Sequence, residues 1–217
     1  TLFRSNNGFK NTVAISNKKI GSVIARPSRV AYDTLLVETA EPVSIGATVY
    51  SISGIPLGNF SSNNKNIVTA SEDFFVKVWD FDKGILSFVS KSGGTFMTFP
   101  KFSHDSKKIA SASTTKSTLI SDVSSGKVLL NLKNETDNII GVEFSNNNNK
   151  IITSSLDGIS KLWDANTGYP LVNLETGNKT ILIPQFSPDD KNILGVSRQF
   201  LKLWNVNSGK IIYNIKA

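Results

Sequence analysis

The chain has 217 residues, of which 39% are hydrophobic and 19% charged, a composition typical of a globular domain rather than a disordered segment. It contains no cysteine and one histidine, which excludes disulfides, a cysteine nucleophile, cysteine-based zinc sites and multi-histidine metal sites. The formal net charge of +7 points to acidic partners such as nucleic acid, but the lysines are spread along the chain, as expected for residues that keep a protein in solution.

A unit of about 42 residues recurs five times, with copies that end near residues 42, 84, 126, 168 and 209. Each of the last four copies carries a Phe-Ser pair, then an isoleucine, a serine and a closing glycine. These markers are Phe60, Phe102, Phe144 and Phe186; Ile67, Ile109, Ile151 and Ile193; Ser71, Ser113, Ser155 and Ser197; and Gly84, Gly126, Gly168 and Gly209. Because all four sets of residues recur at the same interval, they indicate tandem repeats within a single domain that spans residues 1–217.

The first copy is the least regular. Ile15–Ile20 is a shortened version of the Phe-Ser segment, Val37 within Asp33–Glu38 stands where later copies have tryptophan, and Pro42 takes the place of the glycine. The following copies end their third apolar run with Trp79-Asp80, Ser121-Asp122, Trp163-Asp164 and Trp204-Asn205.

Short apolar runs predict four β-strands in each copy and no helix of useful length. In the fourth copy, the runs 151–155 and 159–163 flank Leu156-Asp157-Gly158, which is a tight-turn sequence. In the fifth copy, we expect strands over 181–186, 193–197, 200–204 and 210–215, and the last of these alternates as a half-buried strand does.

Residues 55–217 resemble WD40 repeats, and the first 54 residues match that family poorly. The resemblance lies in the Trp-Asp ending, in the Phe-Ser-x-Asp turn, and in an aspartate six residues before tryptophan, at Asp73 and Asp157. It implies an all-β propeller whose blades are four-stranded sheets. In the family, the turn aspartate joins a hydrogen-bonded network with a histidine, a serine or threonine, and the tryptophan.

The sequence departs from the family in that the Gly-His pair, which opens a typical repeat, is absent throughout. Lys91–Gly93, Asn134–Thr136 and Thr176–Asn178 stand in its place. The fifth copy, with Ser197–Gln199, also lacks the turn aspartate. Because each missing hydrogen bond removes about 0.5–1.5 kcal/mol, we expect stability to depend mainly on apolar packing between blades.

The sequence leaves two alternatives for whether the blades form a closed ring. A closed ring hides the edges of its sheets, but about five blades are fewer than the seven usual for the family. The run 210–215 is an outermost strand that belongs to a blade missing from the sequence or completes the first blade. The chain, which does not begin with Met, is expected to be an open fragment of a larger propeller; the alternative is a five-bladed ring.

Most of the distinctive side chains have expected structural roles. We expect Trp79, Trp163 and Trp204 to pack between blades, and Asp80, Asp122, Asp164, Asp73 and Asp157 to bond the backbone of turns. His104 lies in a surface turn where the other copies have Ser62, Asn146 and Pro188. The sequence therefore predicts no catalytic site, no bound metal and no cofactor.

The resemblance implies that partners dock on the face formed by the turns between second and third strands and by the loops that enter the innermost strands. The candidate residues on this face are Glu72, Phe74, Thr115, Lys116, Leu156, Arg198 and Gln199, joined by the loops around Asn134, Glu135 and Asn178. Phe74 is the best single candidate, because aromatic residues are enriched at interface hot spots. The alternative for Phe74 is that it begins the third strand and packs sideways.

These observations favour a non-catalytic scaffold or recognition module that binds other proteins or peptides. The first alternative is a module of a nucleic-acid-associated assembly, and a second is a small-ligand or enzymatic propeller that uses the central channel. Innermost strands such as 55–60 and 140–144 argue against the second, because they are almost entirely apolar or neutral, with Glu143 as the main exception. No run is long and apolar enough for a membrane helix, and the first residues lack a signal-peptide core, so we expect a cytoplasmic protein with no membrane partner.

Overall fold

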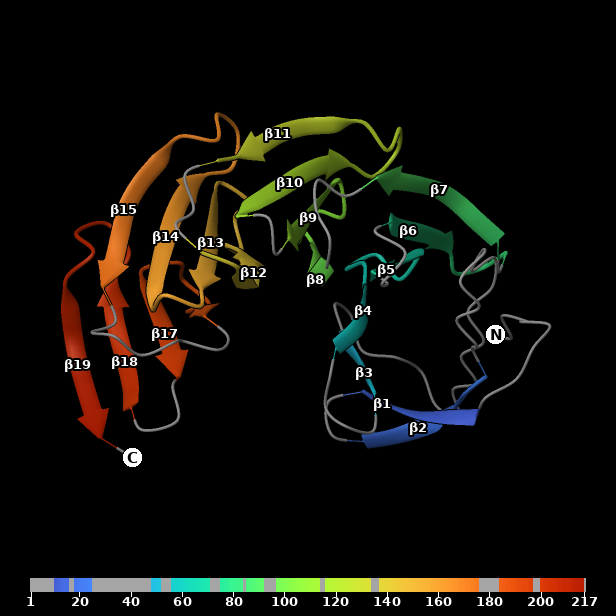
Figure 1. Cartoon of the computed structure of the whole chain (residues 1–217), viewed down its shortest axis with the longest axis horizontal. Helices are drawn as coiled ribbons and strands as arrows, with labels where there is room; N and C mark the ends of the chain where they lie inside the picture. The colour runs from blue at the N-terminus through green and yellow to red at the C-terminus, as the bar shows by residue number, and fades with distance from the viewer. Residues whose placement is uncertain are drawn as a thin grey trace.

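The computed structural model describes residues 10–15, 18–24, 48–51, 56–70, 75–83, 85–91, 97–113, 116–133, 137–175, 184–196 and 200–216 (Figure 1). All of the secondary structure in these ranges is antiparallel β-sheet, and they contain no helix. Consequently, no helix in the described ranges is long and apolar enough to cross a membrane.

Three sheets have four strands each, and each sheet combines three strands of one sequence repeat with the strand that follows the closing glycine of that repeat. The second sheet contains β8 (Met97–Phe102), β9 (Lys108–Ser113), β10 (Ser117–Asp122) and β11 (Val128–Leu132). The third contains β12 (Ile139–Phe144), β13 (Lys150–Ser155), β14 (Ile159–Asp164) and β15 (Pro170–Glu175). The fourth contains β16 (Gln185–Phe186), β17 (Asn192–Val196), β18 (Phe200–Asn205) and β19 (Ile211–Lys216).

The first sheet has seven strands. Four of them follow the plan of the other sheets: β4 (Pro56–Phe60), β5 (Asn66–Ala70), β6 (Phe75–Asp80) and β7 (Ile85–Lys91). The others, β1 (Lys10–Ile15), β2 (Lys18–Ile24) and β3 (Thr48–Ser51), extend this sheet through antiparallel pairing of β3 with β4. The described residues therefore form four sheets, and the strands of the first copy add to the first sheet instead of building a fifth. The markers of that copy at 33–38 and 42 lie outside the described residues.

The four sheets stand side by side in an arc (Figure 1). The innermost strands β4, β8, β12 and β16 follow one another along the inside of the arc, and β8 contacts both β4 and β12. The outermost strands are β7, β11, β15 and β19. In Figure 1 the arc is open between the β16–β19 sheet and β1–β3. Closure of the ring in a larger assembly stays a prediction.

The core lies between neighbouring sheets. The repeated isoleucine pairs directly with the tryptophan of the third strand, as Ile67 does with Trp79, Ile151 with Trp163, and Ile193 with Trp204. The third and fourth sheets therefore each present an Ile-Trp pair to the sheet before them, and the second sheet presents Ile109, which is paired with Ser121. Trp163 packs against the second sheet, and Trp204 packs against the third. Because strand side chains alternate in direction, the same strands also supply the apolar side chains that face the next sheet.

The last strand differs from its prediction. The alternation over 210–215 suggests a half-buried strand, yet all six residues of β19 are exposed. In the preceding sheet, the outermost strand β15 buries Leu174 completely, because the fourth sheet packs against it. No described sheet follows β19, so its apolar side chains stay in solvent.

Candidate functional site

The turns between second and third strands contain the described part of the predicted partner-binding face. Leu156 is 48% exposed in the turn that joins β13 to β14. Its backbone N–H donates to the carbonyl of Asn138 at 2.9 Å, and the Asp157 carboxylate accepts the N–H of Ile159 at 2.9 Å. The turn backbone is therefore held in place while the leucine side chain extends into water.

Lys116 occupies the equivalent turn of the second sheet, between β9 and β10. It is exposed and adopts a left-handed backbone conformation, with φ of 64°. Lys116 and Leu156 thus occupy corresponding turns of neighbouring sheets, and they offer a positive charge and an apolar group to solvent. The other candidates lie outside the described residues, namely Glu72, Asp73, Phe74, Thr115, Arg198, Gln199, Asn134, Glu135 and Asn178.

Behind this face, two tryptophans are held by threonines of the second strand. The Trp79 indole N–H donates to Thr69 Oγ1 at 3.0 Å, and the Trp163 indole N–H donates to Thr153 Oγ1 at 2.9 Å. In the fourth sheet, Gly195 occupies the position of these threonines. Trp204, although 1% exposed, has no hydrogen-bond partner for its Nε1 among the described residues. Part of the family's side-chain network thus persists without its histidine, and it is lost where the threonine is lost.

The aspartates that end the third strands organise the turns at the other end of the sheets. The carboxylate of Asp122 accepts the Ser124 hydroxyl at 2.6 Å and the Ser125 N–H at 2.8 Å. These hydrogen bonds, the one from the Ser124 side chain foremost, lower the pKa of Asp122 from 3.8 to about 2. Hydrogen bonds from the backbone of Lys83 and of Thr167 likewise lower the pKa of Asp80 and of Asp164. Each of these aspartates is therefore occupied in building its own turn.

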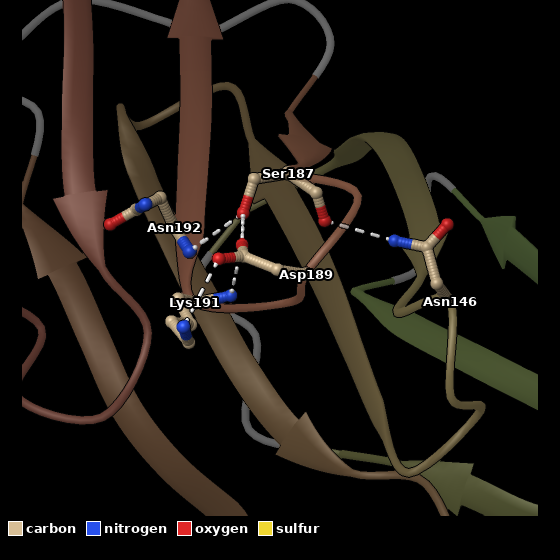
Figure 2. A network of polar contacts seen from close by, with 5 residues as sticks. All are labelled: Asn146, Ser187, Asp189, Lys191 and Asn192. Atoms are coloured by element: carbon tan, nitrogen blue, oxygen red, sulfur yellow. Dashed lines mark hydrogen bonds and ion pairs between the residues drawn. The ribbon is translucent and has the colours of Figure 1, made fainter.

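A second set of turns, between first and second strands, connects neighbouring sheets. Figure 2 shows the turn of the fourth sheet, in which Ser187 and Asp189 bond each other, and Asn146 of the third sheet donates its side-chain N–H to the Ser187 carbonyl at 2.9 Å. Asp190 accepts the backbone N–H groups of Asn146 at 2.7 Å and of Asn147 at 2.9 Å. The sheets are thus bonded by polar groups at this end as well as by their apolar faces.

The sequence analysis did not predict these inter-sheet bonds. A signal was present in the spacing. The residue that bonds the preceding sheet has positive φ in each turn and recurs every 42 residues, at Ser106, Asn148 and Asp190. Asn64 has the same conformation one repeat earlier. Short polar side chains tolerate the left-handed conformation, which explains why Asn, Ser and Asp recur at this turn position.

Within the described ranges, an ion pair joins the inner strands of two neighbouring sheets. Lys101 Nζ on β8 lies 3.3 Å from Glu143 Oε2 on β12, and both side chains are about 20% exposed. The sequence pointed to Glu143 but not to Lys101, which occupies the same repeat position one copy earlier. His104 is exposed in its turn. Among the described residues, no group of three or more His, Cys, Asp or Glu side chains could hold a metal ion.

Comparison with known proteins identifies the repeat. The family model "WD domain, G-beta repeat" matches residues 42–80 and 126–164. No curated protein matches the sequence.

Two solved structures resemble the fold. Hydrazine synthase of Kuenenia stuttgartiensis superimposes with a TM-score of 0.67 at 12% identity, over 73% of this chain and 47% of that chain. The computationally designed Ika4 protein superimposes with a TM-score of 0.60 at 22% identity, over 65% of this chain and 86% of that chain. This chain thus spans less than half the length of the hydrazine synthase chain. At such identities the likeness shows the fold alone, which is that of a β-propeller.

Proposed function

Since the chain is a WD40-repeat protein with a β-propeller fold, we propose that it is a non-catalytic recognition module, which binds another protein or a peptide on the face formed by its second-to-third-strand turns. WD40 repeats generally mediate protein–protein interaction or scaffolding. The observation that carries the proposal for this face is the exposure of Leu156 on a turn whose backbone is fixed by hydrogen bonds.

A rigid turn with an exposed leucine suits recognition for an energetic reason. Binding costs the entropy of ordering flexible groups, and a turn that is already held by its own hydrogen bonds avoids part of that cost. Lys116 adds a positive charge on the neighbouring sheet, which favours a partner with an apolar anchor beside an acidic residue. The proposed face also includes Glu72, Phe74, Thr115, Arg198 and Gln199, with Phe74 as a second apolar anchor.

The absence of catalysis is part of the proposal, and the chemistry of the described side chains supports it. The single histidine is exposed in a turn, and the aspartates at the opposite end are used by their own turns. The Lys101–Glu143 pair on the inner strands, with both side chains about 20% exposed, is already neutralised within the protein.

Affinity capture with the whole chain tests the proposed face. The wild type should retain specific proteins from an extract, and Leu156→Asp combined with Lys116→Glu should lose most of them, because both changes remove complementarity without touching the core. A matched control makes an exposed change of similar size at the other end, Lys107→Glu with Tyr169→Asp. Equal loss in the control, or retention by the face variant, would rule out this face as the binding surface.

The net charge of +7 supports one alternative, a module of a nucleic-acid-associated assembly. That function requires affinity for RNA or DNA that falls steeply with salt, because bound counterions are released from the phosphates. Filter binding with RNA and DNA oligonucleotides at about 50 mM and about 200 mM salt tests it. Lack of binding at the lower concentration would remove the alternative.

A further inference from the structure

Each of the four described sheets has the same irregularity in its outermost strand. Beside the last residues of the third strand, the outermost strand contains a β-bulge, and one of its residues has no direct partner in the third strand. These bulge residues, which lie 41 or 42 residues apart, are Ser87 on β7, Leu129 on β11, Leu171 on β15 and Ile212 on β19. A β-bulge changes the direction of a side chain, so a recurring bulge places one side chain per sheet in the same special position.

Three of the four bulge residues are apolar and exposed. Leu129 and Leu171 are both 49% exposed, and Ile212 is 43% exposed. The first sheet has Ser87, also exposed, at this position, so the fold accepts a small polar side chain there. Leu129 and Leu171 lie on sheets with a described neighbour on either side, and a missing sheet therefore does not explain their exposure. The core does not require these leucines.

The bulge residues belong to a wider apolar band along the outside of the arc, where the outermost strands lie (Figure 1). We call this band the outer rim, and it consists of the exposed residues Val128, Leu129, Tyr169, Leu171 and Ile212. An exposed asparagine follows each apolar bulge residue by two positions, at Asn131, Asn173 and Asn214. Apolar side chains that gather on a surface beside polar ones are typical of an interaction site.

The charges beside the outer rim are mostly positive. Lys127 and Lys133 flank β11, and Lys210 and Lys216 lie at the two ends of the last strand; all four are exposed. Within β7, β11, β15 and β19, Glu175 is the one acidic residue. Complementary charge steers association, so this rim suits an acidic partner. It disfavours a second copy of the chain, because two rims would bring their lysines together.

The bulges also restrict how a partner can dock. The free edge of an outermost strand presents unpaired N–H and C=O groups, but bulges and edge lysines are features that hinder the addition of another strand. We therefore expect docking through side chains. A lipid surface suits the rim less well than a protein, because the asparagine amides and the edge groups would lose water there without gaining hydrogen-bond partners.

We propose that the outer rim is a second binding surface, where Leu129, Leu171 and Ile212 contact the aliphatic side chains of an acidic protein segment. The flanking lysines pair with carboxylates of that segment, and the asparagines bond its polar groups. The rim runs along the outside of the arc, whereas the second-to-third-strand turns lie at one end of the sheets. The inference thus goes beyond the proposed function and does not depend on it.

Selection from a display library of random peptides tests this chemistry, because such a library contains acidic, basic and apolar segments. The whole chain is immobilised, and the affinities of selected peptides are then measured by fluorescence anisotropy. Peptides that combine Asp or Glu with Leu, Ile or Val should be enriched. Leu129→Ser with Leu171→Ser should weaken their binding at least about tenfold, because the buried aliphatic area is lost. Serine suits the bulge, as Ser87 shows.

Two matched variants separate the rim from general effects. Leu156→Ser with Val196→Ser removes two exposed aliphatic side chains elsewhere and should leave the affinity of these peptides unchanged. Lys127→Glu with Lys133→Glu should weaken binding. Lys65→Glu with Lys107→Glu, which changes the net charge equally at exposed sites in other turns, should weaken it much less.

Thiol labelling gives a second readout, since the chain has no cysteine. Leu171→Cys should react with a maleimide more slowly when a selected peptide is bound, and Val196→Cys should react at the same rate with and without it. Failure to select peptides that depend on the rim, or unchanged labelling at 171, would overturn the proposal. So would rim-dependent binding to phosphatidylserine–phosphatidylcholine vesicles in place of peptides, because a lipid surface would then be the occupant.

Discussion

Replacing Gly195 by threonine should stabilise the protein through a hydrogen bond that the fourth sheet lacks. Gly195 pairs with Lys202, as Thr153 pairs with Lys161 in the third sheet. A threonine at 195 would therefore lie two residues after Ile193, which is the strand partner of Trp204. In the third sheet, this geometry gives a bond of 2.9 Å from the indole N–H to the threonine oxygen. The buried Nε1 of Trp204 would gain an acceptor in the same way.

The expected gain has two parts. Leaving a buried donor unsatisfied costs about 1–3 kcal/mol, so supplying the acceptor should recover a similar amount. Replacing glycine in a strand adds up to about 1 kcal/mol through β-propensity and through the lower entropy of the unfolded chain. Gly195→Val provides the second part without the first, because valine has the shape of threonine but no hydroxyl.

The assay is urea denaturation followed by tryptophan fluorescence, and the decisive quantity is the difference between the threonine and valine variants in the free energy of unfolding. That difference should be about 1–3 kcal/mol and should vanish in a Trp204→Phe background, where the donor is gone. The mirror experiment, Thr153→Val, should destabilise by a comparable amount. Equal stability of Gly195→Thr and Gly195→Val would refute the reasoning.

Three further predictions concern the turns. Asp190→Ala should lower the free energy of unfolding by about 0.5–1.5 kcal/mol in chemical denaturation, because the Asn147 N–H loses its partner in the next sheet; Asp190→Asn, which keeps an acceptor, should lose less, and equal losses would contradict this role. Gly209→Ala should lower the free energy of unfolding by about 1–3 kcal/mol in the same assay, because Gly209 has a φ of +67° and an added Cβ would overlap Val172. In a Val172→Ala background, only the part of the loss that comes from the overlap should disappear. A loss below about 0.5 kcal/mol would contradict the close approach. Folding lowers the pKa of Asp122 from 3.8 to about 2. The stabilisation that the Asp122 carboxylate provides is therefore fully present above about pH 4, and it is lost as the pH falls toward about 2. Denaturation midpoints measured across that range should fall less steeply for Asp122→Asn than for the wild type, and parallel curves would exclude the effect.

The repeat allowed most of the fold to be predicted, because each β segment occurs at a fixed interval and has the same neighbours in every copy. The expected strand over 159–163 corresponds to β14, and that over 200–204 corresponds to β18. The prediction was less complete for the first copy, whose strands β1–β3 extend an existing sheet. That copy has Val37 in place of a tryptophan, and a packing partner for one of its strands cannot be read from local sequence.

The candidate face was predicted through the family resemblance, and of its seven residues Lys116 and Leu156 lie in the described part of the chain. The inter-sheet bonds of Asn146 and Asp190 escaped prediction because they join residues 44 apart, through side chains that also suit an ordinary exposed turn. The Lys101–Glu143 pair was missed for a similar reason, since nothing local indicates that their strands lie side by side.

The sequence by itself determined the repeat, the strands and the apolar positions, because side-chain alternation and turn chemistry act over a few residues. Tertiary structure decided which of those positions are covered. Leu174 and Ile215 have equivalent places in their repeats, yet one is fully buried and the other 55% exposed. Burial depends on the presence of a neighbouring sheet, and that neighbour lies a whole repeat away along the chain.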